Sequence, residues 1–471
     1  MNQIKKLLIP IACALLSPGM PAHAASLLEV YQQALQSDPL IHEAESRRLA
    51  ALETLPQARG ALFPQITAGG QYEERSADGG QVIFLPTGPG STVFNNETDS
   101  TGWQVNLRQT IFRWDQLVTL KQANKQVAKA EADYEAAQQD LIVRVTTRYF
   151  DVLAAEDRLR SIHADRLAIA RQLEQAKQRF EVGLIAITDV QESQAAYDQS
   201  VAAEIGAKRE LATARELLRE ITGQYVPSLE APGDEFPLPA PNPAAEQSWI
   251  DLAMDQNLAL IASRLDEQIA RDEIAFRRTG HYPTLELVAN YSDSQDETRD
   301  LIDNLSFDTD VTADSISLQL TVPLFSGGRT SSRVREAVYL HRAAREQLQR
   351  VARETERATR DAYLGVLSEI SRVNALEQAV ASSRTALEAT QAGFEVGTRT
   401  IVDVLNSQRA LYSAITNYYQ SRYVYVGNVL RLKQAAGTLK VEDLEQIDRH
   451  LVEREAPEDV EPEDYGIESG S

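Results

Sequence analysis

The chain has 471 residues, with 69 acidic residues against 47 lysines and arginines, and its formal net charge is −22. This acidic balance argues against nucleic-acid binding, because that function needs lysine and arginine concentrated opposite phosphates. The single cysteine, Cys13, leaves no basis for a disulfide framework or a thiolate metal site.

Residues 1–24 have the order of an export signal. Two lysines precede an apolar run at 7–16, and Ala22-His23-Ala24 has the small residues of a cleavage site. That run is too short to span a bilayer, and the alternative of a buried N-terminal helix fits its charge order less well. We therefore expect export and cleavage after Ala24. An exported chain without a later long apolar stretch should be soluble or should span the outer membrane as a β-barrel.

The rest of the chain repeats itself at an offset of 214 positions. Phe180-Glu181-Val182-Gly183 recurs as Phe394-Glu395-Val396-Gly397, and ten of the seventeen positions from 180 to 196 are identical. Such repetition predicts two structural repeats, which we place at residues 25–226 and 244–444.

Two further segments differ from the repeats in composition. Residues 227–243 contain six prolines and are expected to form an extended linker. Residues 445–471 are rich in glutamate and aspartate and are expected to form an acidic disordered tail.

Each repeat contains a stretch suited to a very long helix. Neither glycine nor proline occurs from Asp115 to Val182, and the equivalent stretch from Arg329 to Ala392 contains only Gly365. Apolar and small residues recur at steps of four and three, then every seven residues, a pattern typical of coiled-coil packing. At 1.5 Å per residue such a helix would be about 100 Å long.

Four further segments alternate between apolar and polar residues, most clearly at Ile316, Leu318, Leu320 and Val322. This pattern suits a lipid-facing barrel strand, but it also suits any half-buried antiparallel strand. Four strands cannot close a barrel, so a membrane sheet of this kind must be shared between copies. We predict strands near residues 64–74, 101–111, 282–292 and 314–324, joined by polar loops at 73–100 and 292–313.

With these features the sequence resembles the TolC family of outer-membrane efflux and secretion ducts. The most specific segments are Arg179–Val190, Leu217–Gly223, Pro323–Gly328 and Gly397–Leu405. The resemblance implies a mostly α protein with a membrane β-barrel, built from duplicated strand–strand–long-helix–turn–helix units. It implies a homotrimer in which a 12-stranded β-barrel continues into a long periplasmic α-helical barrel.

The same resemblance implies a passive exit duct of an efflux pump or type I secretion system, in the cell outer membrane and reaching into the periplasm. Its partners would be outer-membrane lipid, a periplasmic adaptor protein and an inner-membrane transporter of the ABC, RND or MFS class. No cofactor is implied. The alternative function is a periplasmic coiled-coil adaptor or spacer, but an adaptor usually has one helical hairpin, whereas this chain has two complete sets.

The resemblance also implies a gate at the periplasmic end, with adaptor contacts at the duplicated turns. The turns, near 183–187 and 397–401, would meet the adaptor through Gly183, Leu184, Gly397 and Thr398. The gate residues would be Thr188, Asp189, Phe394, Arg399, Asp403 and Asn406.

Two gate positions depart from the family pattern: Phe394 stands where well-known members have tyrosine, and Asn406 replaces a second acid. Arg399 is expected to pair with Asp189 of an adjacent turn. For Asp189 and Asp403 the alternative role is helix N-capping, which is worth about 1 kcal/mol.

Signals of catalysis are weak throughout the sequence. The histidines lack the spacing of a zinc site. Ser326-Gly327-Gly328 follows a predicted strand, but it lacks the Lys-Ser/Thr of a phosphate-binding loop. We therefore read it as a tight connection and predict that the protein is not an enzyme.

Overall fold

The computed structural model describes residues 24–86, 88–233, 236–302 and 305–454. The predicted signal, apart from Ala24, lies outside the described residues. The chain divides into two units. Of the described residues, the first unit holds those up to His42, Ala137–Asn257 and those from Thr355 onward, and the second holds Glu43–Ala136 and Leu258–Glu354. Each unit therefore draws on both sequence repeats.

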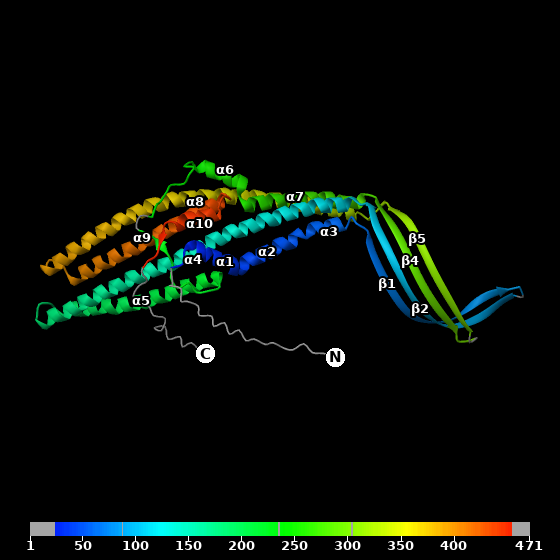
Figure 1. Cartoon of the computed structure of the whole chain (residues 1–471), viewed down its shortest axis with the longest axis horizontal. Helices are drawn as coiled ribbons and strands as arrows, with labels where there is room; N and C mark the ends of the chain where they lie inside the picture. Colours follow the sequence, from blue (N-terminus) through cyan, green and yellow to red (C-terminus); the bar gives the residue numbers. More distant parts are fainter. Residues whose placement is uncertain (1–23, 87, 234–235, 303–304, 455–471) are drawn as a thin grey trace, which may run out of the picture. The chain divides into compact units, whose positions relative to one another are not determined.

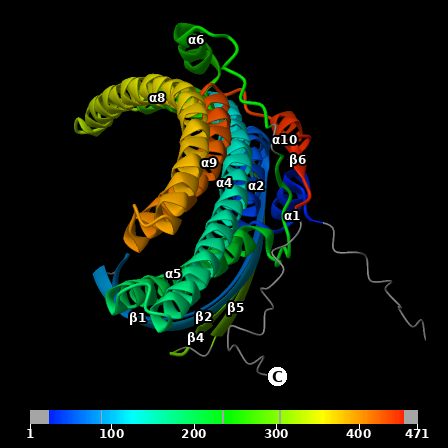
Figure 2. The same cartoon turned by 90° about the vertical axis from the view of Figure 1, so that its left-hand side faces the viewer.

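The first unit is mainly helical (Figures 1 and 2). The long helices α4 and α8 enter it at Ala137 and Thr355. Its elements are α1 (Leu27–Ser37), the later part of α4 (Trp114–Glu181), α5 (Ile187–Thr222), β3 (Ala231–Pro232), α6 (Glu246–Gln256), the later part of α8 (Arg329–Glu395), α9 (Ile401–Ala435), α10 (Val441–Asp448) and β6 (Leu451–Val452).

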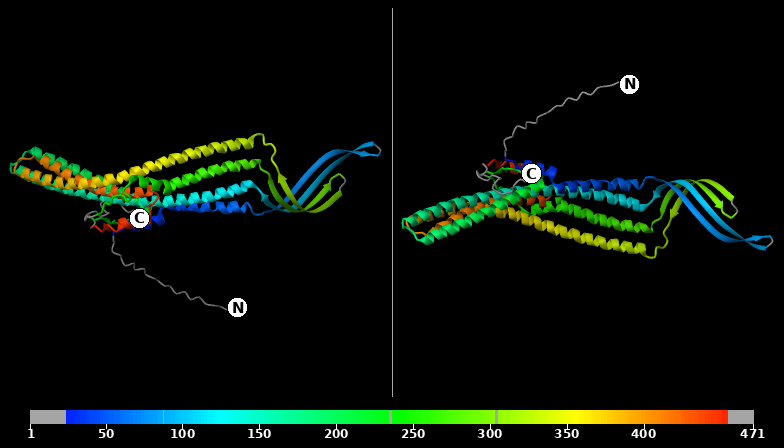
Figure 3. Two further views of the ribbon diagram at one scale, coloured as in Figure 1. Left: turned by 90° about the horizontal axis from the view of Figure 1, so that it is seen from above. Right: turned by 90° about the horizontal axis from the view of Figure 1, so that it is seen from below.

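The second unit combines helices with one large sheet (Figure 3). Besides the first parts of α4 and α8, it contains α2 (Pro39–Leu52, from Glu43), α3 (Thr54–Gly60), β1 (Gln65–Leu85), β2 (Gly88–Phe112), α7 (Leu258–Arg278), a 3₁₀ turn (Thr279–His281), β4 (Thr284–Asp300) and β5 (Leu305–Thr321).

The two long helices confirm the prediction from the glycine- and proline-free stretches. α4 has 68 residues and α8 has 67, so each is about 100 Å long at 1.5 Å per residue. In the first unit, Val145, Val152 and Leu159 of α4 repeat every seven residues and are all buried, as coiled-coil packing requires. In the described part of the chain, no helix combines the length and the apolarity that crossing a membrane demands.

The four long strands form one antiparallel sheet in the order β1-β2-β4-β5. The predicted polar loops at 73–100 and 292–313 are wrong, because most of these residues belong to paired strands. For example, Glu73 pairs with Ser100, and Asp296 with Thr309. Ladder hydrogen bonds join backbone groups, so strands continue where the apolar side chains end. The β1–β2 hairpin extends beyond β4 and β5 (Figure 3).

The described part of the proline-rich linker includes the two-residue strand β3, and the predicted disorder is wrong for the first residues of the acidic tail. Residues 445–448 complete α10, and β6 pairs with β3 of the linker. Leu444 is fully buried and Leu451 nearly so, and burial of such side chains outweighs the acidic composition around them. Residues 455–471 lie outside the described part.

A buried polar cluster also holds the end of the described chain. Asp157 of α4 is buried and accepts hydrogen bonds from Arg454, at 2.7 Å, and from the hydroxyl of Tyr423. Burial, and then the charge of Asp157, raises the pKa of Tyr423. The contact ties α4, α9 and the segment after β6 together.

Candidate functional site: the paired helical turns

Two short turns connect the hairpins of the first unit and have the same backbone geometry. One joins α4 to α5 and the other joins α8 to α9, and both lie at the same end of the unit (Figures 1 and 2). Gly183 and Gly397 have φ angles of 74° and 77°, a backbone conformation that residues with a Cβ rarely adopt. The N–H of Leu184 donates to the carbonyl of Arg179 at 2.8 Å, and the N–H of Thr398 donates to that of Gly393, also at 2.8 Å. These bonds have the pattern of a Schellman motif, and they confirm both predicted turns.

The turns expose apolar side chains to solvent. Val182, Leu184 and Val396 are 70–75% exposed. Both glycines have open space around the position of a Cβ. Exposed apolar side chains gathered in this way, rather than scattered singly, are typical of an interaction surface.

Behind the turns, the two hairpins pack against each other. Ile169 of α4, Ala196 of α5, and Ile401 and Leu405 of α9 form a buried cluster, with Tyr197 and Phe394 against it. Phe394, one of the predicted gate residues, is therefore held against packed helices close to the turns. Phe394 is partly buried, and its ring lies beneath the guanidinium of Arg179, 5.0 Å from the ring centroid.

Asp403 belongs to a capping box at the start of α9. Thr400 is the N-cap; its Oγ1 accepts from the N–H of Asp403 at 3.2 Å. In return, the Asp403 carboxylate accepts from the N–H and from the hydroxyl of Thr400, both at 2.9 Å. The backbone hydrogen bond from Thr400 is the main cause that lowers the pKa of Asp403. The structure thus gives Asp403 the capping role that was the alternative to a gate role.

The equivalent α5 start is built differently. Ala186 is the N-cap and makes no side-chain capping bond, so the capping alternative is wrong for Asp189. Thr188 is exposed and Asp189 is half-buried in the first turn. Neither side chain is used in a helix cap, and both remain available for other contacts.

Arg399 is exposed at the second turn, and its Cγ lies against Gly393. Among the described residues of one chain, Arg399 and Asp189 form no ion pair, so that expected contact is absent within the chain. Asn406 is also exposed. The structure therefore brings the predicted gate residues to one end of the unit without joining these two charges.

Sequence reasoning did not assign a role to three polar residues between the hairpins. Gln408 of α9 bonds to Asp165 and Gln172 of α4. The repeat contained a signal, because Ser193-Gln194 and Ser407-Gln408 match at the 214-residue offset. That match does not show which of the two glutamines is buried.

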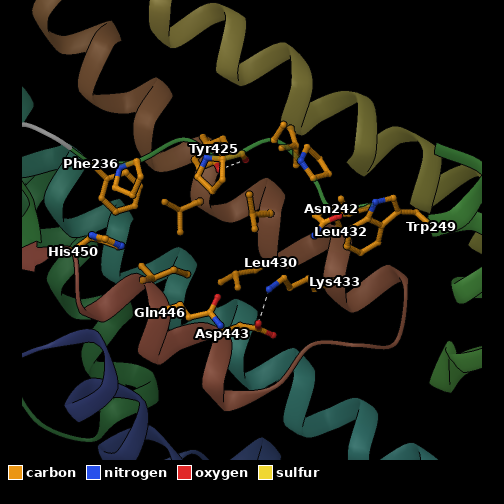
Figure 4. A pocket seen from close by; sticks show the side chains of 18 residues that line it. Phe236, Asn242, Trp249, Tyr425, Leu430, Leu432, Lys433, Asp443, Gln446 and His450 are labelled. Carbon is orange, nitrogen blue, oxygen red and sulfur yellow. Dashed lines mark hydrogen bonds and ion pairs between the residues drawn. The ribbon is translucent and has the colours of Figure 1, made fainter. Parts of the chain in front are cut away.

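A pocket of about 320 Å³ lies elsewhere in the first unit, under the linker (Figure 4). Phe236 and Trp249 lie at its two ends, and the hydroxyl of Tyr425 donates to the carbonyl of Pro239 at 2.8 Å. Burial raises the pKa of Tyr425 to about 12. The charged groups Lys433 and Asp443 pair with each other at 2.5 Å. These contacts assign the pocket to packing of the linker against α9 and α10.

Among the described residues, no group of three or more histidine, cysteine, aspartate or glutamate side chains is placed to hold a metal ion.

Comparisons with known proteins agree over nearly the whole chain. The family model described as outer membrane efflux protein matches residues 30–224 and 249–438. Outer membrane protein TolC of Vibrio cholerae is 37% identical over 449 residues, covering 95% of this chain and 99% of the relative. TolC of Escherichia coli is 36% identical, with coverage of 97% and 92%. The alkaline protease secretion protein AprF of Pseudomonas aeruginosa is 28% identical, with coverage of 93% and 89%.

Solved structures share the fold at lower identity. A membrane protein from Pseudomonas aeruginosa superposes with a TM-score of 0.73 at 19% identity, covering 88% of this chain and 95% of that one. CusC superposes with a TM-score of 0.71 at 16% identity, with coverage of 88% and 92%. The arrangement of helices and strands is thus the fold of these two membrane proteins.

Proposed function

This chain belongs to the outer membrane efflux protein family, and we propose that three copies of it form a gated duct that docks onto a periplasmic adaptor. It is an outer-membrane protein and a passive exit duct for efflux or type I secretion, not an enzyme. Closure of the sheet, the number of copies, the docking surface and the gate are the parts of this function that we propose.

The observation that carries the proposal is the pair of open edges on the sheet. Among the strands that the structure describes, β1 pairs only with β2, and β5 pairs only with β4. An unpaired edge is not tolerated in lipid, because its N–H and C=O groups find no partner there. β5 and β1 run antiparallel, so β5 of one copy can pair with β1 of the next. Three copies then supply twelve strands, enough to close a barrel.

One face of this sheet has the character of a lipid contact. Ile66, Leu107, Ala289 and Ile316 lie directly opposite one another across the four strands. Further along that face, the rings of Trp103 and Tyr291 lie 5.2 Å apart. An apolar band ending in aromatic residues is typical of the outer surface of membrane barrels. We assign this face to outer-membrane lipid.

The exposed turns suit docking of a periplasmic adaptor. Both repeats present the same glycine turn with apolar side chains, so three copies would present six similar turns. A repeated surface of this kind can bind a symmetric ring of partner subunits. We assign contact to Gly183, Leu184, Gly397 and Thr398, together with their exposed apolar neighbours. The inner-membrane partner would be a transporter of the ABC, RND or MFS class.

The gate positions Thr188, Asp189, Phe394, Arg399, Asp403 and Asn406 adjoin these turns. Thr188 and Asp189 take no part in a helix cap, and the charge of Arg399 helps to lower the pKa of Asp403 without an ion pair to Asp189 among the described residues of one chain. Pairing of Arg399 with Asp189 of a neighbouring copy remains our proposal. Individual exposed pairs contribute about 0–1 kcal/mol. Three symmetric pairs acting on one opening would add their effects.

Assembly and membrane insertion are tested together. Purified protein in mild detergent should have the mass of three copies, and the membrane fraction should show heat-modifiable gel mobility. A stable conducting monomer would rule out the shared barrel. Recovery of all the protein in the soluble periplasm would favour the alternative, a non-channel coiled-coil adaptor or spacer.

Docking is tested at the turns. Gly183→Trp and Gly397→Trp should abolish efflux while trimers still assemble. The double variant Leu184→Ser/Val396→Ser leaves both glycines in place and should weaken efflux. Ile205→Ser is the control, because Ile205 is 65% exposed in the middle of α5. Normal efflux by all the turn variants would refute contact at this end.

A further inference from the structure

Gln408 is a polar residue buried in the contact between the two hairpins of the first unit. Its side chain is 1% exposed near the start of α9. The amide Nε2 donates to Oδ1 of Asp165 at 2.6 Å and to the carbonyl of Asp165 at 3.1 Å. The amide Oε1 accepts from Nε2 of Gln172 at 3.0 Å. We call Asp165, Gln172 and Gln408 the Gln408 node.

The node lies beside an apolar contact between α4 and α9. On α4, Ile169 lies between Asp165 and Gln172, and this buried side chain belongs to the cluster that includes Ile401 and Leu405 of α9. Steps of four and three residues place each set on one helix face. The node therefore sits where α4 of one hairpin packs on α9 of the other.

The internal duplication shows that this node is particular to one contact. At the 214-residue offset Gln408 corresponds to Gln194, but Asp165 corresponds to Ala379 and Gln172 to Ala386. Gln194 is half-buried, and its side-chain amide donates to Asp198 of its own helix at 2.9 Å. The duplicated positions, on α5 and α8, thus lack the polar partners of the node, although both hairpins have the same turn.

The node has features of a contact that selects one arrangement rather than one that maximises stability. A buried polar group is costly unless it is hydrogen-bonded, so a shift of α9 along α4 would leave Gln408 and Asp165 without their partners. Burial raises the pKa of Asp165. Oε1 of Gln172 is buried and has no hydrogen-bond partner among the described residues. Single buried amides fix register in coiled coils in the same way, at some cost in stability.

We propose that the Gln408 node fixes the register of the two hairpins and thereby keeps the periplasmic end of the duct closed until a partner docks. The inference rests on the proposed function and adds a positioning residue to it. Gln408 contacts no cargo in this account; it acts by holding α9 on α4.

Planar-bilayer recordings of the purified trimer test the node. Gln408→Met keeps the volume and removes all three hydrogen bonds of the side chain, so we expect conductance to rise by at least about two- to tenfold, the range for the loss of a single net hydrogen bond. Gln194→Met is the matched control at the duplicated position and should conduct as the wild type does. Equal conductance of the two variants and the wild type would refute the gating role of the Gln408 node.

A charge exchange separates gating from general destabilisation. Gln408→Glu places a second carboxylate beside Asp165, and we expect conductance to rise. Adding Asp165→Asn supplies an amide donor to the introduced carboxylate and should return conductance to the wild-type level. If this rescue fails, the node has only a structural role. The same conclusion follows if the Gln408 variants do not assemble while Gln194→Met does. A wild-type protein that forms no pore would instead refute the proposed function.

Discussion

The guanidinium of Arg179 lies over the ring of Phe394, with 5.0 Å between its central carbon and the ring centroid. Arg179 is near the end of α4 and Phe394 near the end of α8, so the contact joins the two hairpins beside their turns. Phe394 has no hydroxyl group, yet its ring face still makes an inter-hairpin contact. A cation–π contact of this kind contributes about 0.5–1 kcal/mol at an exposed site.

This contact predicts different effects for two replacements of the same residue. Phe394→Leu removes the ring face and should raise single-channel conductance, whereas Phe394→Tyr keeps the face and should not. Arg179→Gln should resemble Phe394→Leu. Bilayer recordings of all three variants provide the measurement. Unchanged conductance in Phe394→Leu and Arg179→Gln would remove this contact from the gate.

Asp403 is predicted to act mainly on the stability of the start of α9. Loss of the cap should lower the stability of Asp403→Ala and Thr400→Ala to a similar extent, as measured by thermal unfolding of the trimer. Arg399→Ser leaves the capping box intact and should instead raise conductance. If Asp403→Ala alone lowers cation preference while Thr400→Ala does not, the Asp403 carboxylate also faces the pore.

Gly437 is predicted to tolerate no side chain. It has a φ angle of 72°, and a Cβ there would lie 2.1 Å from the carbonyl oxygen of Gln256. Gly437→Ala should therefore lose at least about 1–3 kcal/mol from backbone strain, with the overlap in addition. Gly427→Ala is the control, since it lies within α9 with open space around its Cβ position, and should gain up to about 1 kcal/mol. Thermal unfolding of the two variants should shift in opposite directions.

The lysine contacts of Asp272 predict that the stability of the second unit depends on pH. Burial opposes its charge, but hydrogen bonds from Lys125, at 2.5 Å, and Lys121, at 3.2 Å, lower its pKa. Because the pKa of Asp272 is lower in the folded state, its carboxylate adds stability that is fully present above its unfolded-state pKa, near 3.9. That stability is lost as the pH falls through the folded-state pKa. Asp272→Asn should cost about 1.5–3 kcal/mol at neutral pH.

The same comparison repeated at falling pH gives the test of Asp272. The difference in unfolding temperature between wild type and Asp272→Asn should shrink once pH falls below about 4. A difference that stays constant between neutral pH and pH 3 would show that the carboxylate charge is not the cause.

Local sequence patterns predicted some elements well and others poorly, for physical reasons. The turns at Gly183 and Gly397 were predictable because one short motif, written twice, sets the backbone geometry. The strands were underestimated because Glu73 and Asp296 are polar, and backbone pairing does not depend on side-chain character. The order after Leu444 was missed because composition does not show which apolar residue becomes buried. Gln408 could not be assigned because its partners lie on another hairpin, more than two hundred residues away.

The open edges of β1 and β5 have a consequence for genetics. If each barrel needs three chains, a defective chain that still assembles spoils the sound chains that it joins. When half of the chains in a cell are defective and mixing is random, only about one assembly in eight contains sound chains alone. Variants at the turns that leave the sheet edges intact should therefore be dominant over the wild-type gene, whereas variants that prevent strand pairing should be recessive. Co-expression of each kind with the wild-type gene would distinguish the two classes.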